Sequence, residues 1–317
     1  MWSMDTIEWI DIELTSFCNI QCKGCFRVIS KQADKILNKE FINLEIIKTR
    51  FQKNMFPNIK IINFCGSVDE PCTHPQFFDI IKHFAEWNCH INIATNGSLK
   101  TKEWWGKLAT LLPTSHRVTW GIDGSDKLSE EYRQGSNFNK VKENFKSFIA
   151  AGGHAVWQFI VFEHNEHQLE QAKIIAKEEG FKDFKVIMSH RENVNDIKHK
   201  KVGDILELDL LKTTISCKYG NQKRIFVNHM GNVIPCCHLN SKMLEFSITN
   251  EIKDDFEKIL TLNDYKNEIN INNVSIEHAI NGPIFNSIKQ SWESSPIPRC
   301  NQVCKNKERD IFIKSSL

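Results

Sequence analysis

Three cysteines lie close together near the start of the chain, at Cys18, Cys22 and Cys25. This spacing allows all three thiols to bind one metal centre and leaves its fourth coordination position without a protein ligand. Structural zinc sites and simple electron-transfer clusters usually have four protein ligands, whereas a substrate or cofactor binds at an open position. The alternative is that the three are structural thiols in a reducing compartment.

The pattern of apolar residues predicts the elements that must hold this loop. Residues 7–14 alternate apolar and acidic side chains, as a strand does, and the cysteine loop follows directly. Further strands are expected at residues 58–64, 90–94, 117–122, 155–162 and 184–188. Helices are expected at residues 40–53, 76–86, 102–112, 139–150 and 166–179. About six strand–helix units predict an α/β fold, a parallel sheet curled into a partial (βα)6 barrel. Its active site is expected where loops leave the C-terminal ends of the strands.

The cysteine loop, with Phe17 before it and Phe26 after it, resembles the cluster loop of radical S-adenosylmethionine (SAM) enzymes. The resemblance implies that Cys18, Cys22 and Cys25 bind three irons of a 4Fe–4S cluster and that SAM chelates the fourth. Reductive cleavage of SAM would give a 5′-deoxyadenosyl radical that abstracts hydrogen from a substrate. An electron donor such as flavodoxin or ferredoxin is implied as a partner.

Loops after three of the expected strands resemble the SAM-binding segments of the same family. Gly66 to Pro71 resembles the glycine-rich acidic segment, in which Glu70, with Asp69 as a neighbour, would face the SAM ammonium group. A surface turn is the alternative for this segment. The remaining candidate cofactor residues come from the next two loops and are Thr95, Asn96, Asp123 and Arg133.

A second set of cysteines follows residue 200. A hairpin is predicted with strands at 224–227 and 233–234, and Gly231 stands five residues before Cys236. This arrangement, with an earlier Cys and a later Cys pair, resembles the twitch domain, a shortened form of the SPASM extension of radical SAM enzymes. The resemblance implies an auxiliary 4Fe–4S cluster, and the candidate thiolates are Cys217, Cys236, Cys300 and Cys304.

Several alternatives stay open for the cysteines. Cys237 is left out because neighbouring side chains on an extended segment point in opposite directions, although it could replace one of the four thiolates. A zinc knuckle is the alternative to the auxiliary cluster. Cys65, Cys72 and Cys89 are interpreted as buried apolar side chains, with a hydrogen-atom donor as a second interpretation for the first two.

Composition sets the remaining limits. The chain has 317 residues, 41% of them hydrophobic, which is enough for a barrel domain at 1–200 and a small α+β iron–sulfur domain at 201–317. The residues from 189 to 201 are polar and are expected to connect the two. A net charge of +2 gives no support for nucleic acid. Eleven cysteines without an apolar N-terminal segment or a membrane span predict a cytoplasmic protein.

The function expected from this resemblance is hydrogen abstraction by a radical SAM enzyme, with the auxiliary cluster assisting oxidation or binding the substrate. The first candidate substrate is a ribosomally made peptide, because twitch and SPASM domains commonly accompany peptide substrates. The second is a small molecule, such as a sugar alcohol that is oxidised to a ketone. A third, non-enzymatic possibility is an iron–sulfur electron carrier.

Overall fold

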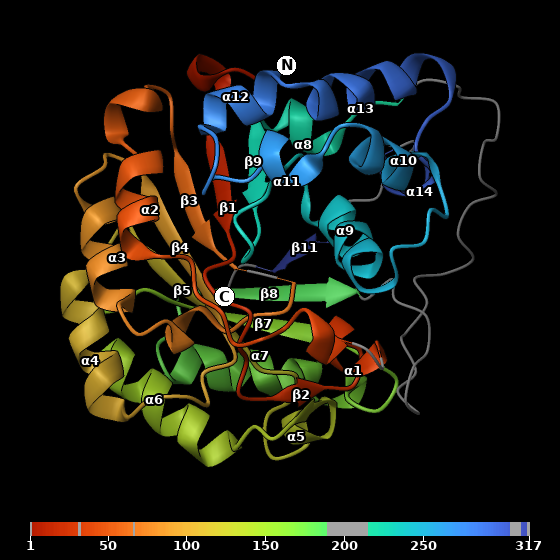
Figure 1. Cartoon of the computed structure of the whole chain (residues 1–317). Coiled ribbons are helices and arrows are strands. Elements are labelled where there is room, and N and C mark those ends of the chain that lie inside the picture. The colour runs from red at the N-terminus through yellow and green to blue at the C-terminus, as the bar shows by residue number, and fades with distance from the viewer. Residues whose placement is uncertain (1, 31–32, 66, 189–214, 305–311, 316–317) are drawn as a thin grey trace.

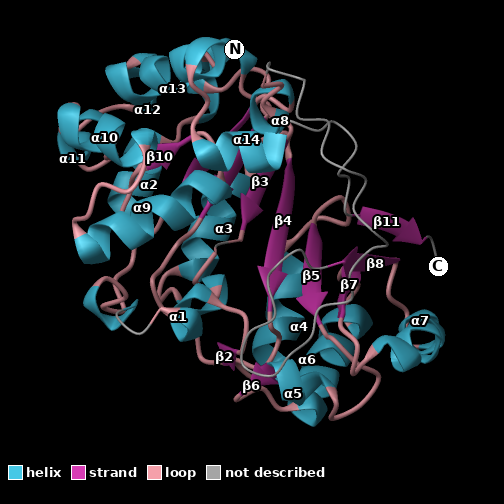
Figure 2. Ribbon diagram, turned by 90° about the vertical axis from the view of Figure 1, so that its right-hand side faces the viewer, coloured by secondary structure: helices cyan, strands magenta, loops and turns pink. Residues whose placement is uncertain are grey.

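The computed structural model describes residues 2–30, 33–65, 67–188, 215–304 and 312–315. In this part of the chain the main sheet has nine strands in the order β10-β9-β1-β3-β4-β5-β7-β8-β11 (Figures 1 and 2). These strands are β1 (Trp9–Ile12), β3 (Ile61–Phe64), β4 (His90–Thr95), β5 (Arg117–Gly121), β7 (Ala155–Val161), β8 (Asp183–Met188), β9 (Arg224–Val227), β10 (Val233–Ile234) and β11 (Phe312–Ser315). A separate antiparallel pair is formed by β2 (Gln21–Cys22) and β6 (Arg133–Gln134).

The helices of the N-terminal half alternate with these strands. They are α1 (Phe26–Ile29), α2 (Leu44–Arg50), α3 (Phe77–Ala85), α4 (Lys102–Leu111), α5 (Ser129–Tyr132), α6 (Phe138–Ala150) and α7 (Leu169–Glu178). Short 3-10 turns are η1 (Met4–Thr6), η2 (Ala33–Lys35), η3 (Lys53–Met55), η4 (Pro71–Thr73) and η5 (Glu166–Gln168). Because β1, β3, β4, β5, β7 and β8 pair in parallel in this order, the predicted partial barrel is confirmed.

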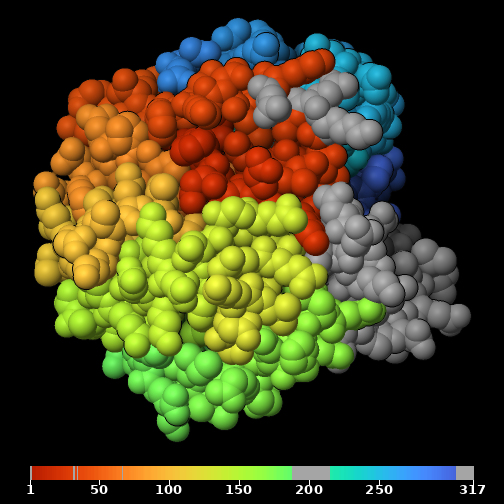
Figure 3. Space-filling view, turned by 90° about the horizontal axis from the view of Figure 1, so that it is seen from below, coloured from red at the N-terminus to blue at the C-terminus, as the bar shows by residue number. Residues whose placement is uncertain are grey.

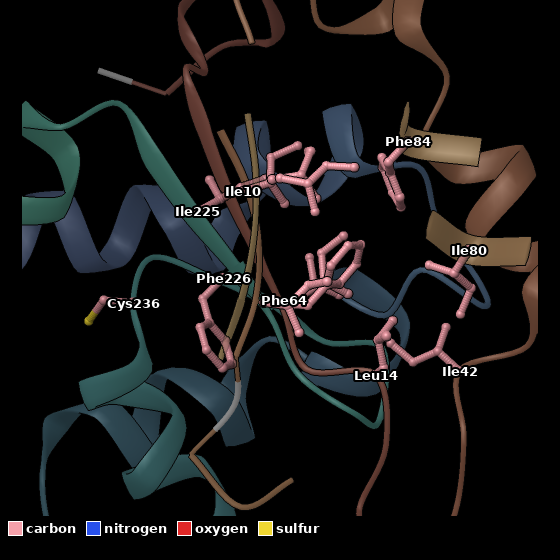
Figure 4. Packing of buried hydrophobic residues seen from close by; sticks show 14 of the residues in the cluster. Ile10, Leu14, Ile42, Phe64, Ile80, Phe84, Ile225, Phe226 and Cys236 are labelled. Carbon is pink, nitrogen blue, oxygen red and sulfur yellow. The ribbon is translucent and has the colours of Figure 1, made fainter. Parts of the chain in front are cut away.

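The outer face of the barrel is apolar and rich in aromatic rings. Figure 4 shows Ile10 beside Ile225 of the neighbouring strand, with Phe64 toward Phe84 of α3. The ring centroids of Phe64 and Phe84 are 5.6 Å apart, and the rings of Trp105 and Trp120 join α4 to β5 at 4.5 Å. Such buried aromatic pairs contribute both area and specific ring geometry, so these contacts fix the helices on the sheet.

The inner face of the same strands is polar, because alternate residues of a strand point to opposite faces. The Asn63 amide donates to Asp11 at 2.6 Å, the Asn92 amide donates to Asn63, and the Thr119 hydroxyl donates to Asn92 at 2.9 Å. Arg224 of β9 completes this series with a hydrogen bond of 2.8 Å to Asp11. Polar side chains therefore line the inside of the barrel from β9 to β5.

The C-terminal region adds the hairpin β9–β10 and a layer of helices. Its helices are α8 (Lys218–Asn221), α9 (Cys237–Thr249), α10 (Asp255–Leu262), α11 (Tyr265–Glu268), α12 (Ile276–Asn281), α13 (Pro283–Ser294) and α14 (Pro298–Cys304). They gather at one end of the molecule, beyond β9 and β1 (Figure 1). Because β9 pairs in parallel with β1, this region extends the barrel sheet directly.

Most of the elements expected from sequence are found within a few residues of their predicted bounds, including both strands of the hairpin. The last strand, β11, pairs with β8 in the tail. The 13-residue helix α9 and the β2–β6 pair were not predicted. The polar connector at 189–201 and the proposed boundary at 200 lie outside the described residues, so the division into domains stays a prediction.

Gly97 gives a test of this packing. Its φ is +70°, and an added Cβ would stand 2.6 Å from the Trp120 ring, whereas Gly152 has a φ of +89° with open space around it. We expect Gly97→Ala to lower the free energy of unfolding by about 2–4 kcal/mol, because it adds overlap to backbone strain. Gly152→Ala should cost about 1–2 kcal/mol through strain alone. Urea unfolding measures both, and equal losses would contradict the packing.

Candidate functional site

The cysteine loop lies between β1 and α1 and is held against the rest of the barrel by backbone pairing. Cys22 of β2 stands opposite Arg133 of β6, and the Lys23 amide donates to the Tyr132 carbonyl at 3.1 Å. On the face seen in Figure 3, the red and orange N-terminal segment lies at the centre, beside the yellow-green segment that follows β5. The structure thus places Arg133, a predicted cofactor residue, next to a predicted cluster ligand.

The first of the three thiols is bordered by the loop after β4. The side-chain amide nitrogen of Asn96 lies 3.8 Å from Cys18 Sγ and donates to the Asn19 side chain at 3.0 Å. Burial, followed by the Glu70 carboxylate, raises the pKa of Cys18 to about 12, and Cys22 and Cys25 add to this effect. These electrostatic contacts place the three thiols in one neighbourhood.

The three sulfur atoms are not yet arranged around one point. Among the described residues no group of three His, Cys, Asp or Glu side chains stands ready to hold a metal ion. The Cys25 thiol lies 3.9 Å from the Ser67 carbonyl instead. The donor set suits iron because thiolates are the usual ligands of iron–sulfur clusters. Binding a cluster would require the side chains to turn toward a common centre.

Glu70 ties two cofactor loops together. One carboxylate oxygen accepts from the Thr95 hydroxyl at 2.8 Å, and the other accepts from the backbone amide of Asn96 at 2.7 Å. The Cys72 amide also points at this carboxylate, at 3.4 Å. Burial raises the pKa of Glu70, although these hydrogen bonds act in the opposite direction. Thr95, Asn96 and Glu70 are therefore brought together, with both Glu70 oxygens already engaged by the protein.

Asp69 is placed differently from its neighbour. Its Oδ2 accepts from the Leu14 amide at 3.1 Å, whereas its Oδ1 is buried with no hydrogen-bond partner among the described residues. Burial, then the nearby charges of Glu13 and Glu70, raise the pKa of Asp69 well above its usual range. An acidic group under this repulsion suits a cationic ligand such as an ammonium group. Gly66, also predicted for this loop, lies outside the described residues.

Asp123 and Arg133 form a buried ion pair. Arg133 Nε lies 2.8 Å from Asp123 Oδ2, and Asp123 Oδ1 accepts from the Ile160 amide at 2.8 Å. The guanidinium lies over Gly121, where a Cβ would come within 2.6 Å of it. Arg133 thus already has a carboxylate partner, which also holds β7. The assignment of Arg133 as a cofactor residue stays a prediction.

Sequence reasoning missed two buried residues at this site, Glu13 and His229. The Glu13 carboxylate accepts from the backbone of the Ser67 loop and from His229 Nδ1 at 2.8 Å. The alternation of apolar and acidic residues was used to predict the first strand, and it gave no role to Glu13. His229 carried no signal, because its partner is 216 positions away.

A second cysteine site lies in the C-terminal region. Four thiols that are up to 87 positions apart line one pocket, together with the polar side chains of His238 and Arg299 and the ring of Trp292. These thiols belong to Cys217, Cys236, Cys300 and Cys304. All four are buried. The pocket contains the four residues that the sequence proposed for an auxiliary cluster.

The protonation of these thiols is uneven. A hydrogen bond to Cys304, followed by burial, raises the pKa of Cys217, while the same contact lowers the pKa of Cys304 to about 6. The shared contact thus moves the two pKa values in opposite directions. Burial raises the pKa of Cys300 to about 11 and that of Cys236 well above its usual range. As at the first site, these described thiols are not yet grouped to hold a metal ion, and a bound cation would favour their ionised forms.

The other cysteines lie outside this pocket. Cys237 does not line it, and its thiol instead stands 3.4 Å from the Tyr219 hydroxyl. Cys72 and Cys89 are buried, as expected, whereas Cys65 keeps some exposure, and its thiol lies 3.8 Å from Asp11 on the inner face of the sheet. Cys65 is therefore part of the polar lining of the barrel.

The geometry can now be compared with known proteins. The family model of the radical SAM superfamily matches residues 12–188, which include the cysteine loop and the parallel strands from β3 to β8. This chain belongs to the radical SAM superfamily. Membership implies an enzyme that uses a 4Fe–4S cluster and SAM, so the coarse prediction from the cysteine loop is confirmed.

A curated relative matches a limited part of this radical SAM chain. The "tungsten-containing aldehyde ferredoxin oxidoreductase cofactor-modifying protein" of Pyrococcus furiosus is 30% identical over 105 residues, which are 33% of this chain and 28% of that protein. The chain thus spans little more than a quarter of that relative.

Solved structures agree on the fold at low sequence identity. Streptococcus suis SuiB bound to its precursor peptide SuiA has a TM-score of 0.55 and 15% identity, and the match covers 78% of this chain and 62% of that chain. The protein anSMEcpe with bound AdoMet and the Cp18Cys peptide has a TM-score of 0.56 and 15% identity, with 90% and 83% covered. In that complex, SuiB is therefore matched over less than two thirds of its length.

Among the helices in the described part of the chain, none has the length and apolar character that a membrane span requires.

The Asp69 environment predicts a change in stability with pH. Because the pKa of Asp69 is raised in the folded chain, the native state holds its proton longer than the unfolded state does. Wild-type stability should therefore fall as pH rises above about 4, the usual pKa of an aspartate. We expect Asp69→Asn to be more stable than wild type at pH 8, and this advantage should shrink toward pH 4. Urea unfolding across this range measures it, and a difference independent of pH would contradict the raised pKa.

Proposed function

We propose that this chain is a radical SAM enzyme with an auxiliary 4Fe–4S cluster held by Cys217, Cys236, Cys300 and Cys304, and that it modifies a peptide. The observation that carries the auxiliary site is the pocket lined by these four thiols. They come from the start of α8, the start of α9 and both turns of α14, so no local motif explains why they meet. Four thiolates are the usual ligand number of a closed cluster.

The protein's own part in the reaction is to hold and orient. Cys18, Cys22 and Cys25 would bind the first cluster, and Asp69 would bind the SAM ammonium through Oδ1, which has no hydrogen-bond partner among the described residues. Glu70 holds the loop of Thr95 and Asn96 beside Cys18. When bound, the first cluster with SAM supplies hydrogen abstraction from the substrate, and the auxiliary cluster supplies an electron acceptor or a ligand for the substrate.

Support for a peptide substrate comes from the comparisons. Two proteins that share the fold over most of this chain, SuiB and anSMEcpe, are described with bound peptides. The small-molecule alternative is favoured by one observation, the polar inner face of the sheet from Arg224 to Thr119. That face could bind the hydroxyl groups of a sugar alcohol, so the two substrate classes must be separated by experiment.

Iron content tests the two cluster sites. Anaerobically reconstituted wild-type protein should hold about eight irons per chain. We expect about four irons in the triple alanine variant of Cys18, Cys22 and Cys25, and about four in the quadruple alanine variant of the pocket thiols. The matched control is Cys237→Ala, which removes a neighbouring thiol outside the pocket and should keep about eight irons. Iron analysis with sulfide analysis measures all four proteins.

Two results would contradict the auxiliary site. One is about four irons in wild type and none in the triple variant, with zinc in place of the rest. The other is loss of four irons in Cys237→Ala, which would show that this thiol is a ligand and that the pocket assignment is wrong.

Transfer of deuterium tests the substrate class. The reconstituted enzyme is supplied with SAM, a reductant and a pool of fully deuterated peptides, or instead with a pool of deuterated sugar alcohols. We expect deuterium in the 5′-deoxyadenosine formed with peptides, because the abstracted hydrogen comes from the substrate. Mass spectrometry of 5′-deoxyadenosine gives the answer. Deuterium from the sugar alcohols alone would favour the small-molecule alternative.

A further inference from the structure

A buried carboxylate connects the first strand to the predicted SAM loop. Glu13 follows β1 directly and is 0% exposed. Its Oε1 accepts from the backbone amides of Ser67 and Val68, at 2.7 and 3.0 Å. These two amides lie one and two residues before Asp69. Glu13 therefore fixes the backbone from which the proposed ammonium ligand projects.

The other oxygen of this carboxylate is bound by the hairpin of the C-terminal region. Glu13 Oε2 accepts from His229 Nδ1 at 2.8 Å and from the His229 backbone amide at 3.3 Å. His229 is 3% exposed and sits in the turn between β9 and β10. Its hydrogen bond and charge lower the pKa of Glu13 against the effect of burial. The pair is thus a charge-assisted contact, which is stronger than a neutral hydrogen bond.

A second path joins the same two regions. Asn240 of α9 donates to the Ser67 hydroxyl at 2.8 Å and accepts from the Asn228 side chain at 2.9 Å. Asn228 directly precedes His229, so the contacts close into a ring through Glu13 and Ser67. The Asn240 backbone amide donates to the carbonyl of Cys236, at 3.2 Å. A proposed auxiliary ligand is therefore bonded directly to this ring.

We propose that Glu13 and His229 are a positioning pair that couples the auxiliary site to the SAM loop, an inference that rests on the proposed function. Loading of the pocket fixes Cys236 and the start of α9. Through Asn240 and His229, the hydrogen bonds of the ring then hold the amides of Ser67 and Val68 in a matching position. SAM then binds to a loop whose geometry depends on the C-terminal region, and such coupling between sites is reciprocal.

The test uses His229 variants that differ in which ring nitrogen they imitate. His229→Asn places an amide N–H near the position of Nδ1 and can still donate to Glu13, whereas His229→Gln imitates Nε2 and His229→Phe donates nothing. We expect His229→Phe and His229→Gln to raise the SAM dissociation constant of the reconstituted protein about 10–100-fold, as loss of a supporting contact commonly does. His229→Asn should keep most of the wild-type affinity. Anaerobic equilibrium dialysis with labelled SAM measures each protein.

Asn270→Ala is the matched control. Asn270 donates to the Met230 carbonyl at 2.8 Å and to the Asn232 side chain, so its loss loosens the same hairpin through contacts other than those of Glu13. We expect this variant to lose stability with little change in SAM affinity. Asn240→Ala removes the other connection of the ring, the contact between Asn240 and the Ser67 hydroxyl. This variant should weaken SAM binding while Glu13 and His229 remain paired.

Coupling itself is measured by combining variants. The quadruple alanine variant of the pocket thiols should weaken SAM binding when His229 is present and should have little further effect in His229→Phe, since coupled residues are not additive. Additive effects of the two changes on SAM affinity would overturn the inference. Equal SAM affinities of His229→Asn and His229→Gln would also overturn it, as would a loss of SAM affinity in Asn270→Ala as large as in His229→Phe. If wild type itself fails to bind SAM, the proposed function fails. If wild type binds and all His229 variants bind equally, the positioning role alone fails.

Discussion

The structure depends on one buried negative charge, the carboxylate of Glu13. An isolated ionised carboxylate inside a protein is strongly disfavoured, so it must be paired and hydrogen-bonded. Two loop amides and the His229 side chain supply these partners, and the pKa of Glu13 is lowered despite full burial. The same charge acts on Asp69, whose pKa is raised. Burial is the largest cause of the raised pKa of Asp69, and the charges of Glu13 and Glu70 add to it, so the pKa values of Glu13 and Asp69 are shifted in opposite directions.

The first strand extends this constraint over the molecule, because two buried acidic residues lie at alternate positions, Asp11 in β1 and Glu13 directly after it. Asp11 pairs with Arg224 on β9, and Glu13 pairs with His229 in the following turn. Both partners are more than 200 positions away, so the C-terminal region must dock before either charge is satisfied. Long-range pairing of this kind slows folding. The strand β9, which lies in sequence between the pocket residues Cys217 and Cys236, is paired in parallel with β1 of the barrel.

The sequence predicted what depends on local pattern. Strand alternation and helical spacing located the parallel strands and most helices, because each buries an apolar face whose period is visible in the residues. Two short apolar runs on either side of turn residues likewise predicted the hairpin β9–β10. The four pocket thiols were proposed together through family resemblance, and the structure independently gathers them around one pocket. Which thiols bind a metal stays a prediction.

What the sequence did not predict depends on distant partners. α9 has only a weak amphipathic pattern, since it is covered on several sides and its buried residues include polar Asn240. The alternating acids of β1 were compatible with a solvated strand, and only the fold shows that they are buried against Arg224 and His229. Glu70 was expected to face the ammonium group, yet its oxygens are engaged by Thr95 and Asn96. Within the described part of the chain, Asp69 has a carboxylate oxygen without a hydrogen-bond partner.

The two cysteine sites differ in the electrostatics that a metal would meet. At Cys18 the pKa is raised by burial and by an acidic neighbour, so a proton must leave before sulfur can bind iron. In the C-terminal pocket, Cys304 is already the acidic member of its pair, and the side chain of Arg299 lines the same pocket. A thiolate is the form that binds metal. The other three pocket thiols have raised pKa values, so most ligands at either site must lose a proton before they bind metal. Metal binding at both sites should therefore release protons and strengthen as pH rises.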